Sequence, residues 1–229
     1  LSDQKVDTKR LEALFANALD NTPYIRSLSL LNNQGKIIVS SLEDNIEEEI
    51  SFENFYPKPF GDNAILRVGL PWEGRDFSNA RQTLPSAPLQ GDAMYFLPVL
   101  KKIYFGSKPY TIVANINPLY LLNNYLNILP SDVGSFKIYR SDGILLLSTD
   151  KNSHIGSSRD INFEEKTDDD SAVFYQMLNK SDNLIQHVKE SLTLPFLVQV
   201  ILDEKEALAY WDKERNKVLF ISASLIILC

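Results

Sequence analysis

The spacing of apolar and polar positions repeats itself along the chain. Residues 30–41, "LLNNQGKIIVSS", consist of an apolar run, a polar turn that ends at Gly35, and a second apolar run that ends in two serines. Residues 138–149, "IYRSDGILLLST", have the same order, and their glycine, Gly143, stands 108 positions after Gly35. Asn and Gly supply the positive φ angles that tight hairpin turns require. Each segment is therefore predicted to form a β-hairpin.

Two shorter segments repeat in the same order as the hairpins. "ISFE" at 50–53 returns as "INFE" at 161–164, and "PYTIVANIN" at 109–117 returns as "PFLVQVILD" at 195–203. Three similarities in one order indicate two tandem copies of one sheet module. Short connections favour antiparallel pairing within each sheet, with the helices packed on one face.

Helical spacing marks the segments before, between and after the two copies. Residues 3–20 form a predicted helix that ends before Pro23, and residues 118–129 form another that has a proline in its first turn. A third helix is predicted over 203–217. Residues 78–92, rich in Pro and small polar residues, are predicted to be a loop. Further strands are predicted at 64–71, 93–105, 110–116, 183–191 and 195–202.

Residues 218–229, "VLFISASLIILC", contain no charge and only two polar residues. These 12 residues are fewer than the roughly 20 that cross a bilayer. A helix packed on the surface of a core has one polar side, whereas this run is apolar on every side. We therefore expect it to begin a transmembrane helix, with a preceding anchor upstream of Leu1. The alternative is an apolar helix packed on the core.

Composition and charge exclude several classes of function. The net charge of -7 and the absence of a Lys/Arg cluster argue against binding to nucleic acid. The one cysteine, Cys229, provides neither a disulfide framework nor a cysteine metal site. His154 and His187 stand alone, without the partners of a metal site or a catalytic triad. We therefore expect no metal, no cofactor and no catalytic residue.

Two acidic runs, within 43–49 and 164–170, are the remaining candidates for chemistry. They lack the ligand spacing and the turn glycine of a dedicated calcium loop. No two of these carboxylates are marked as a buried, convergent glycosidase pair. We expect both runs to be solvated connections, with cation binding as the alternative, and we expect this part of the protein not to be an enzyme.

Four segments carry a resemblance to a known family: "YIRSLSLLNNQGKIIVSS", "YTIVANINPLYLLNNYL", "FKIYRSDGILLLST" and "LPFLVQVILDEKEALAYW". In this order, before an apolar run, they resemble the double Cache, or tandem PAS-like, sensor domain of bacterial membrane receptors. The resemblance covers nearly the whole chain and implies an α+β fold. Two antiparallel-sheet modules would lie along an N-terminal helix, and a C-terminal helix would lead into the membrane. The implied divisions are 1–23, 24–130, 131–203 and 204–229.

The resemblance also implies a function. Such a domain is a periplasmic sensor held in the inner membrane by its flanking helices, and we expect it to form a homodimer. The membrane-distal module, 24–130, would bind a small molecule, and the membrane-proximal module, 131–203, would relay the change. The closing "ILDEKEALAYW" is most similar to sensors of diguanylate cyclases and phosphodiesterases, while histidine kinases and chemoreceptors carry the same module. The alternative is a non-sensing assembly or interaction domain of a membrane protein.

Polar and amphipathic residues on or beside the distal strands are the candidates for a ligand pocket, which needs a few oriented polar groups in an apolar cleft. Arginines would anchor a carboxylate or phosphate, and aromatic rings would form flat walls. Amino-acid-binding members of the family carry an Asp late in the last distal strand, where this chain has Asn115 and Asn117. A carboxylate or a neutral polar solute is therefore favoured over a free amino acid. The predicted site residues are Arg67, Trp72, Arg75, Asp92, Tyr95 and Asn115.

The transmembrane prediction can be tested by lengthening the chain. A protein that continues for about ten native residues beyond Cys229 should require detergent, because the apolar run would then approach the length of a bilayer span. The measurement is fractionation with and without detergent, followed by size-exclusion chromatography. A lengthened protein that stays monodisperse without detergent would contradict the prediction.

Overall fold

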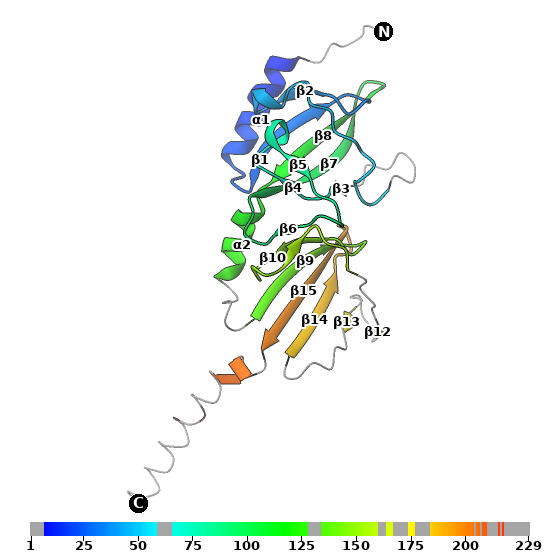
Figure 1. Ribbon diagram of the computed structural model, residues 1–229. Helices are drawn as coiled ribbons and strands as arrows, with labels where there is room; N and C mark the ends of the chain where they lie inside the picture. The colour runs from blue at the N-terminus through cyan, green and yellow to red at the C-terminus, as the bar shows by residue number, and fades with distance from the viewer. Residues whose placement is uncertain are drawn as a thin grey trace, which may run out of the picture.

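The computed structural model describes residues 7–58, 66–127, 134–159, 164–166, 174–176 and 184–203, together with 205–206, 208–209, 215 and 217. Two antiparallel sheets lie one beyond the other along the molecule, each with one helix beside it (Figure 1). The predicted α+β class is confirmed, and so is the predicted antiparallel pairing.

The N-terminal sheet has the strand order β2-β1-β8-β7-β4-β5, with β3 beside β7. The two long strands β7 and β8 form its centre, where the predictions at 93–105 and 110–116 are confirmed. Its strands are β1 (Ile25–Leu31), β2 (Ile37–Ser40), β3 (Arg67–Val68), β4 (Trp72–Glu73), β5 (Arg81–Gln82), β7 (Tyr95–Phe105) and β8 (Lys108–Ile116).

The C-terminal sheet has the order β10-β9-β15-β14-β13-β12. Its first four strands repeat the order β2-β1-β8-β7, so the tandem repeat in the sequence is a repeat of topology. A separate two-stranded sheet pairs β6 (Leu89–Gln90) with β11 (His154–Ile155). The strands of the C-terminal sheet are β9 (Gly134–Arg140), β10 (Leu145–Ser148), β12 (Glu164–Lys166), β13 (Phe174–Gln176), β14 (Leu184–Glu190) and β15 (Phe196–Asp203).

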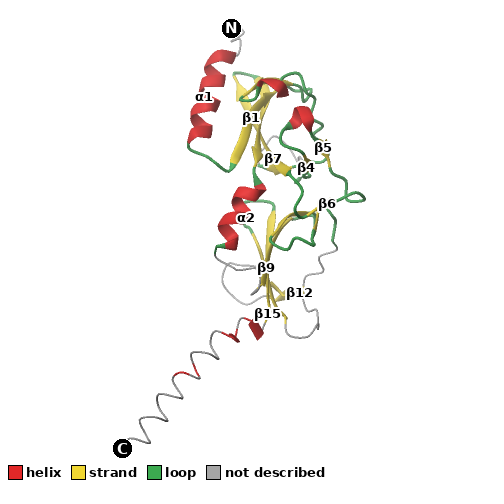
Figure 2. Cartoon of the chain, turned by 60° about the vertical axis from the view of Figure 1, so that its left-hand side comes forward, coloured by secondary structure: helices red, strands yellow, loops and turns green. Residues whose placement is uncertain are grey.

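Each sheet has its own helix on one face. Phe15 of α1 (Thr8–Asp20) packs with Leu30 and Val39 of the N-terminal sheet. Leu122 of α2 (Pro118–Leu126) packs in the same way on the C-terminal sheet. The N-terminal helix therefore lies beside the first sheet, and α2 takes the equivalent place beside the second (Figure 2). The expectation that one helix runs along both modules is corrected in this respect.

The hairpin glycines explain why the same turn occurs twice. Gly35 has φ +85° and Gly143 has φ +89°, a left-handed conformation that favours glycine. The N–H of Ile50 donates to the Gly35 carbonyl at 2.9 Å, and the N–H of Arg159 donates to the Gly143 carbonyl at 3.1 Å. A Cβ at either glycine would collide with the carbonyl oxygen of Ile50 or Arg159. Each turn thus holds the segment that follows its hairpin.

Several short elements differ from the sequence prediction. The strand predicted at 64–71 is β3 alone among the described residues. The N–H of Gly69 still donates to the Pro98 carbonyl of β7 at 2.8 Å, but Pro71 has no N–H for a ladder. The predicted loop 78–92 contains β5 and β6, whose two residues each are too short to show a period. Two 3₁₀ turns, η1 (Glu43–Asn45) and η2 (Phe77–Asn79), interrupt the connections.

The predicted C-terminal elements lie mainly outside the described residues. Only scattered positions of the predicted helix 203–217 are described, and none of 218–229 is. Within the described ranges, no helix combines the length and the hydropathy that crossing a bilayer requires.

One apolar cluster belongs to both sheets. The N-terminal part of the chain contributes strand ends and the short β6. The C-terminal part contributes the hairpin β9–β10 and the strands β11, β14 and β15. The two sheets therefore share a core. Its buried members are Val68, Leu70, Leu89, Tyr95, Leu97, Tyr139, Ile144, Leu145, Leu146, Ile155, Val188 and Leu197.

The turn glycines give a graded stability test. Ala at Gly35 or Gly143 should lower the free energy of unfolding by more than the about 1–2 kcal/mol of a left-handed backbone, because the Cβ also collides with a carbonyl. Gly106→Ala is the matched control, since Gly106 has φ +62° and open space around it. Urea unfolding followed by circular dichroism measures all three. Equal losses at Gly35, Gly143 and Gly106 would contradict the collision.

Candidate ligand site on the N-terminal sheet

The face of the N-terminal sheet that points away from α1 is covered by the long connection between β2 and β7. Side chains directly opposite in antiparallel strands share a face, and alternate residues of a strand do too. Ser27 of β1 stands opposite Asn115 of β8, and Asn115 stands opposite Pro98 of β7. All three therefore lie on this covered face. The apolar cluster there consists of Leu31, Ile37, Ile50, Phe55, Phe77, Phe96, Leu100 and Val113.

Ser27 and Asn115 are buried polar residues without partners. Each is 1% exposed. The Ser27 hydroxyl and both polar atoms of the Asn115 amide have no hydrogen bond within the part of the chain that is described. Such an atom costs about 1–3 kcal/mol relative to a paired one. In folded proteins these groups are satisfied by ordered water or by a ligand.

A second pair of unpaired atoms lies on the same face. Trp72 of β4 stands opposite Phe96 of β7 and opposite Gln82 of β5. The indole Nε1 of Trp72 and the Nε2 of Gln82 are buried and have no partner among the described residues. The Trp72 ring lies 6.1 Å from the Phe96 ring at 22°, and 5.1 Å from the Phe77 ring at 89°. Aromatic packing therefore holds the indole N–H in place.

The 3₁₀ turn η1 contributes one more unpaired donor. Asn45 is fully buried, and its Oδ1 accepts a hydrogen bond from the N–H of Ser78 at 3.1 Å. The Nδ2 of Asn45 has no partner in the described ranges. The neighbouring Ser29 and Ser40 behave differently, since their hydroxyl oxygens lie 2.9 Å apart in a hydrogen bond. Unpaired polar atoms are therefore a property of particular positions, and not of every polar residue on this face.

The unpaired groups are all uncharged. Among the described residues, the one charged residue in the buried class is Arg140, which belongs to β9. The site offers N–H donors from Trp72, Gln82, Asn45 and Asn115, a hydroxyl from Ser27, and one amide oxygen. Donors outnumber acceptors, so the arrangement suits a compound that presents oxygen acceptors.

Two of the six predicted site residues, Trp72 and Asn115, lie on this face with unpaired polar atoms. Tyr95 points to the C-terminal sheet, where its hydroxyl donates to the Leu146 carbonyl at 3.1 Å, and burial raises its pKa. Arg75 and Asp92 are exposed.

The sixth residue, Arg67, is engaged by the backbone. Its Nε donates to the Pro57 carbonyl at 2.7 Å. Its Nη2 donates to the carbonyls of Phe52 at 3.0 Å and Phe55 at 2.9 Å. Burial lowers the pKa of Arg67. The guanidinium therefore holds the segment 52–57 in place, and these hydrogen bonds occupy the N–H groups that would bind an anion.

Four polar residues of this region, Ser27, Asn45, Gln82 and Arg26, were not among the predicted site residues. Ser27 could have been predicted to lie on one face of its strand, because polar and apolar residues alternate in "IRSLSLL". Arg26, at an irregularity of β1, donates to Asn117 Oδ1 at 2.8 Å and to the Gly74 carbonyl at 3.4 Å. Burial, followed by repulsion from Arg75, lowers the pKa of Arg26.

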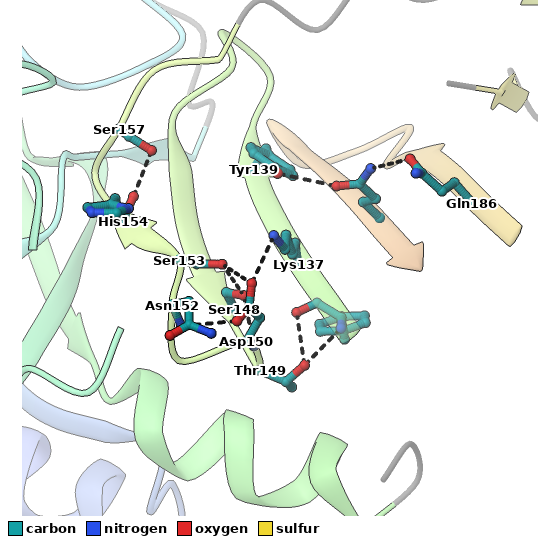
Figure 3. Close-up of polar contacts among 12 residues, drawn as sticks. Lys137, Tyr139, Ser148, Thr149, Asp150, Asn152, Ser153, His154, Ser157 and Gln186 are labelled. Carbon is teal, nitrogen blue, oxygen red and sulfur yellow. Dashed lines mark hydrogen bonds and ion pairs between the residues drawn. The ribbon is translucent and has the colours of Figure 1, made fainter. Parts of the chain in front are cut away.

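The corresponding face of the C-terminal sheet is polar but paired (Figure 3). Tyr139 donates to Gln199 Oε1 at 3.2 Å, and Gln199 donates to Gln186 at 3.4 Å. Lys137 lies 3.5 Å from an Asp150 oxygen. Burial acts to raise the pKa of Asp150, but hydrogen bonds from Asn152 and other neighbours outweigh it and lower the pKa. These groups satisfy one another.

Two open hollows lie away from the unpaired atoms. One of about 600 Å³ lies at the end of the C-terminal sheet, beside Asp150 and Asp203. Another of about 570 Å³ lies between α1 and η1, beside Glu12 and Glu43. Neither is lined by the unpaired groups. We place the candidate site on the covered face because, among the described residues, the buried polar side-chain atoms without a partner lie there.

Comparisons with solved structures identify the fold. The extracellular domain of a histidine kinase, rpHK1S-Z16, matches with a TM-score of 0.55 and 17% identity, over 87% of this chain and 79% of that one. The ligand-binding domain of the Pseudomonas aeruginosa PAO1 amino acid chemoreceptor PctB, in complex with L-Gln, matches with a TM-score of 0.53 and 12% identity, over 96% and 84%. The chain has the fold of these extracytoplasmic sensor domains. The resemblance found in the sequence is thus confirmed as a likeness of fold.

A further sensor structure matches the same fold. The extracellular domain of the histidine kinase vpHK1S-Z8 has a TM-score of 0.50 and 15% identity, over 89% of this chain and 77% of that one. No protein-family model matches the chain, and no curated protein does. The sensor fold is therefore recognised through the arrangement of its strands.

The unpaired atoms predict an unusual gain in stability. Ser27→Ala should raise the free energy of unfolding of the ligand-free protein by about 1 kcal/mol, because it removes a buried hydroxyl that has no partner. Ser29→Ala, on the same strand and face and equally buried, should lower it by about 1 kcal/mol, because it breaks the bond to Ser40. Urea denaturation compares the two. Losses of equal size would contradict this description of Ser27.

Proposed function

We propose that the chain is the ligand-sensing domain of a bacterial membrane signal-transduction receptor. The observation that carries this proposal is the set of unpaired polar atoms on the covered face, centred on Ser27 and Asn115. The sensor fold supports it, because solved domains with this fold are extracellular parts of histidine kinases and chemoreceptors.

The two sheets have different roles in this proposal. The N-terminal module, 24–130, is membrane-distal and binds the small molecule. The C-terminal module, 131–203, is membrane-proximal and relays the change, because its polar face is internally paired. Residues 204–229 continue towards the inner membrane, so the domain is periplasmic, and the receptor acts as a homodimer.

The ligand is a small neutral or carboxylate-bearing compound with several oxygen acceptors. Trp72 Nε1 and Gln82 Nε2 can only donate, and the amide of Asn115 can both donate and accept. A free ammonium group is best bound by a nearby carboxylate, and the unpaired set contains none. Amines are therefore disfavoured.

The output lies on the cytoplasmic side of the membrane. The candidates are a histidine kinase, which the solved neighbours favour, or a diguanylate cyclase or phosphodiesterase, which the closing segment "ILDEKEALAYW" favours. In either case the signal leaves the C-terminal sheet through the segment that follows β15.

A thermal-shift screen of metabolites tests the proposal. A compound at 100 times its Kd should stabilise the protein by about 2.7 kcal/mol. The stabilising compounds should be neutral or carboxylate-bearing, and Asn115→Leu should abolish the shift while Asp92→Ala, at an exposed position, should not. No stabilising compound in a broad screen would favour the non-sensing alternative. Shifts that survive Asn115→Leu would place the site elsewhere, and amine ligands would refute the proposed chemistry.

A further inference from the structure

A guanidinium from the C-terminal sheet reaches into the N-terminal half of the chain. Arg140, at the end of β9, is 5% exposed. Its Nη1 donates to the carbonyl of Asn54 at 2.7 Å and to that of Val68 at 3.0 Å. Its Nε and Nη2 donate to the two carboxylate oxygens of Asp142 at 2.7 and 2.8 Å. The bidentate pair fixes the plane of the guanidinium and aims its remaining N–H groups at the two carbonyls.

Asn54 continues this chain of contacts to the candidate site. Its Nδ2 donates to Gln82 Oε1 at 2.8 Å. This bond sets the orientation of the Gln82 amide, whose Nε2 is one of the unpaired donors beside Trp72. Arg140 and the site are therefore linked through the backbone and the side chain of one residue.

The internal repeat shows that the hairpin itself does not require this arginine. The position equivalent to Arg140 in the first hairpin is Asn32, 108 positions earlier. Asn32 serves its own turn, because its Oδ1 accepts the N–H groups of Gln34 at 2.9 Å and Lys36 at 3.0 Å. Arg140 pairs with Asp142 of its own turn, and its Nη1 in addition reaches Asn54 and Val68 in the N-terminal part of the chain. The departure from the repeat occurs where the two halves meet.

We propose that Arg140 is a positioning residue of the ligand site on the N-terminal sheet, acting through Asn54 and Gln82. The inference rests on the proposed function, since it concerns the regulation of the same site. Coupling between two sites is reciprocal in free energy. A ligand that engages Gln82 therefore changes the stability of the Arg140 contacts, and the C-terminal module responds at the β9–β10 hairpin.

Tryptophan emission tests the link without any ligand. The chain has two tryptophans, Trp72 and Trp211, so Trp211→Phe leaves Trp72 as the single reporter. In that protein, Arg140→Lys should shift the emission of Trp72 and raise its quenching by acrylamide, because Lys cannot hold both carbonyls in a fixed plane. Arg81→Lys is the matched control. Arg81 is next to Gln82 but is exposed, and it pairs with Glu73 at 2.7 Å.

A double-mutant comparison separates the route from a general loss of structure. In an Asn54→Ala protein, which lacks the bond to Gln82, adding Arg140→Lys should produce no further change in Trp72 emission. If Arg140→Lys changes Trp72 emission as much in the Asn54→Ala protein as without that substitution, the route through Asn54 and Gln82 is wrong. If Arg140→Lys alone leaves the Trp72 spectrum unchanged, the proposal is wrong. If Arg140→Lys does not fold, Asp142→Asn should give a smaller shift in the same direction. No change in Asp142→Asn would also overturn it.

The result does not depend on the metabolite screen. A screen without a hit, together with a Trp72 response to Arg140→Lys, would leave the link standing and remove the proposed function. A hit that is abolished by Asn115→Leu, together with no Trp72 response, would support ligand sensing and remove the role of Arg140. The two failures are therefore distinguishable.

Discussion

The apolar cluster shared by the two sheets is the contact on which the other features depend. It joins Val68 and Leu97 of the first sheet to Leu146 and Leu197 of the second, so the two sheets share part of their core. Tyr95 and Arg140 both make their hydrogen bonds across this junction. Burial of these two polar groups costs little free energy there, because each donates to a backbone carbonyl. The apolar contacts hold the two sheets together, and these hydrogen bonds fix how one sheet is placed against the other.

Against this closely paired junction, the covered face of the first sheet is an exception. Ser27 and Asn115 are as buried as the core residues around them, yet their polar atoms are left without partners in the described chain. Folded proteins accept such local costs mainly at functional sites, where a binding partner offsets them. The equivalent face of the second sheet shows the opposite solution, since Tyr139, Gln199 and Gln186 satisfy one another. The two modules therefore share a strand order but differ in how their interior polar groups are paired.

The long periodic elements could be predicted from the sequence, whereas the site could be predicted only in part. The two hairpins, β7, β8 and both helices follow from local patterns that span a whole element. A strand of two residues such as β5 is too short to show an alternation of polar and apolar residues. Its position is set by the strands that it pairs with, which the sequence does not reveal. Asn115 and Trp72 are predicted site residues that carry buried polar atoms without a partner among the described residues, and their role in a site stays a prediction. The contacts of Arg67 could not be predicted, because its carbonyl acceptors come from a segment 10 to 15 residues earlier whose path no local pattern reveals.

The pairing of β6 with β11 affects how proteins with this fold can be recombined. β6 comes from the first half of the chain and β11 from the second, and Ile155 stands opposite Leu89 in their small sheet. A chimera joined in the connection between the halves would keep both large sheets but would combine a β6 and a β11 that had not evolved together. Transplanting the interior of the first sheet would keep the β6–β11 pair intact, whereas swapping halves would not.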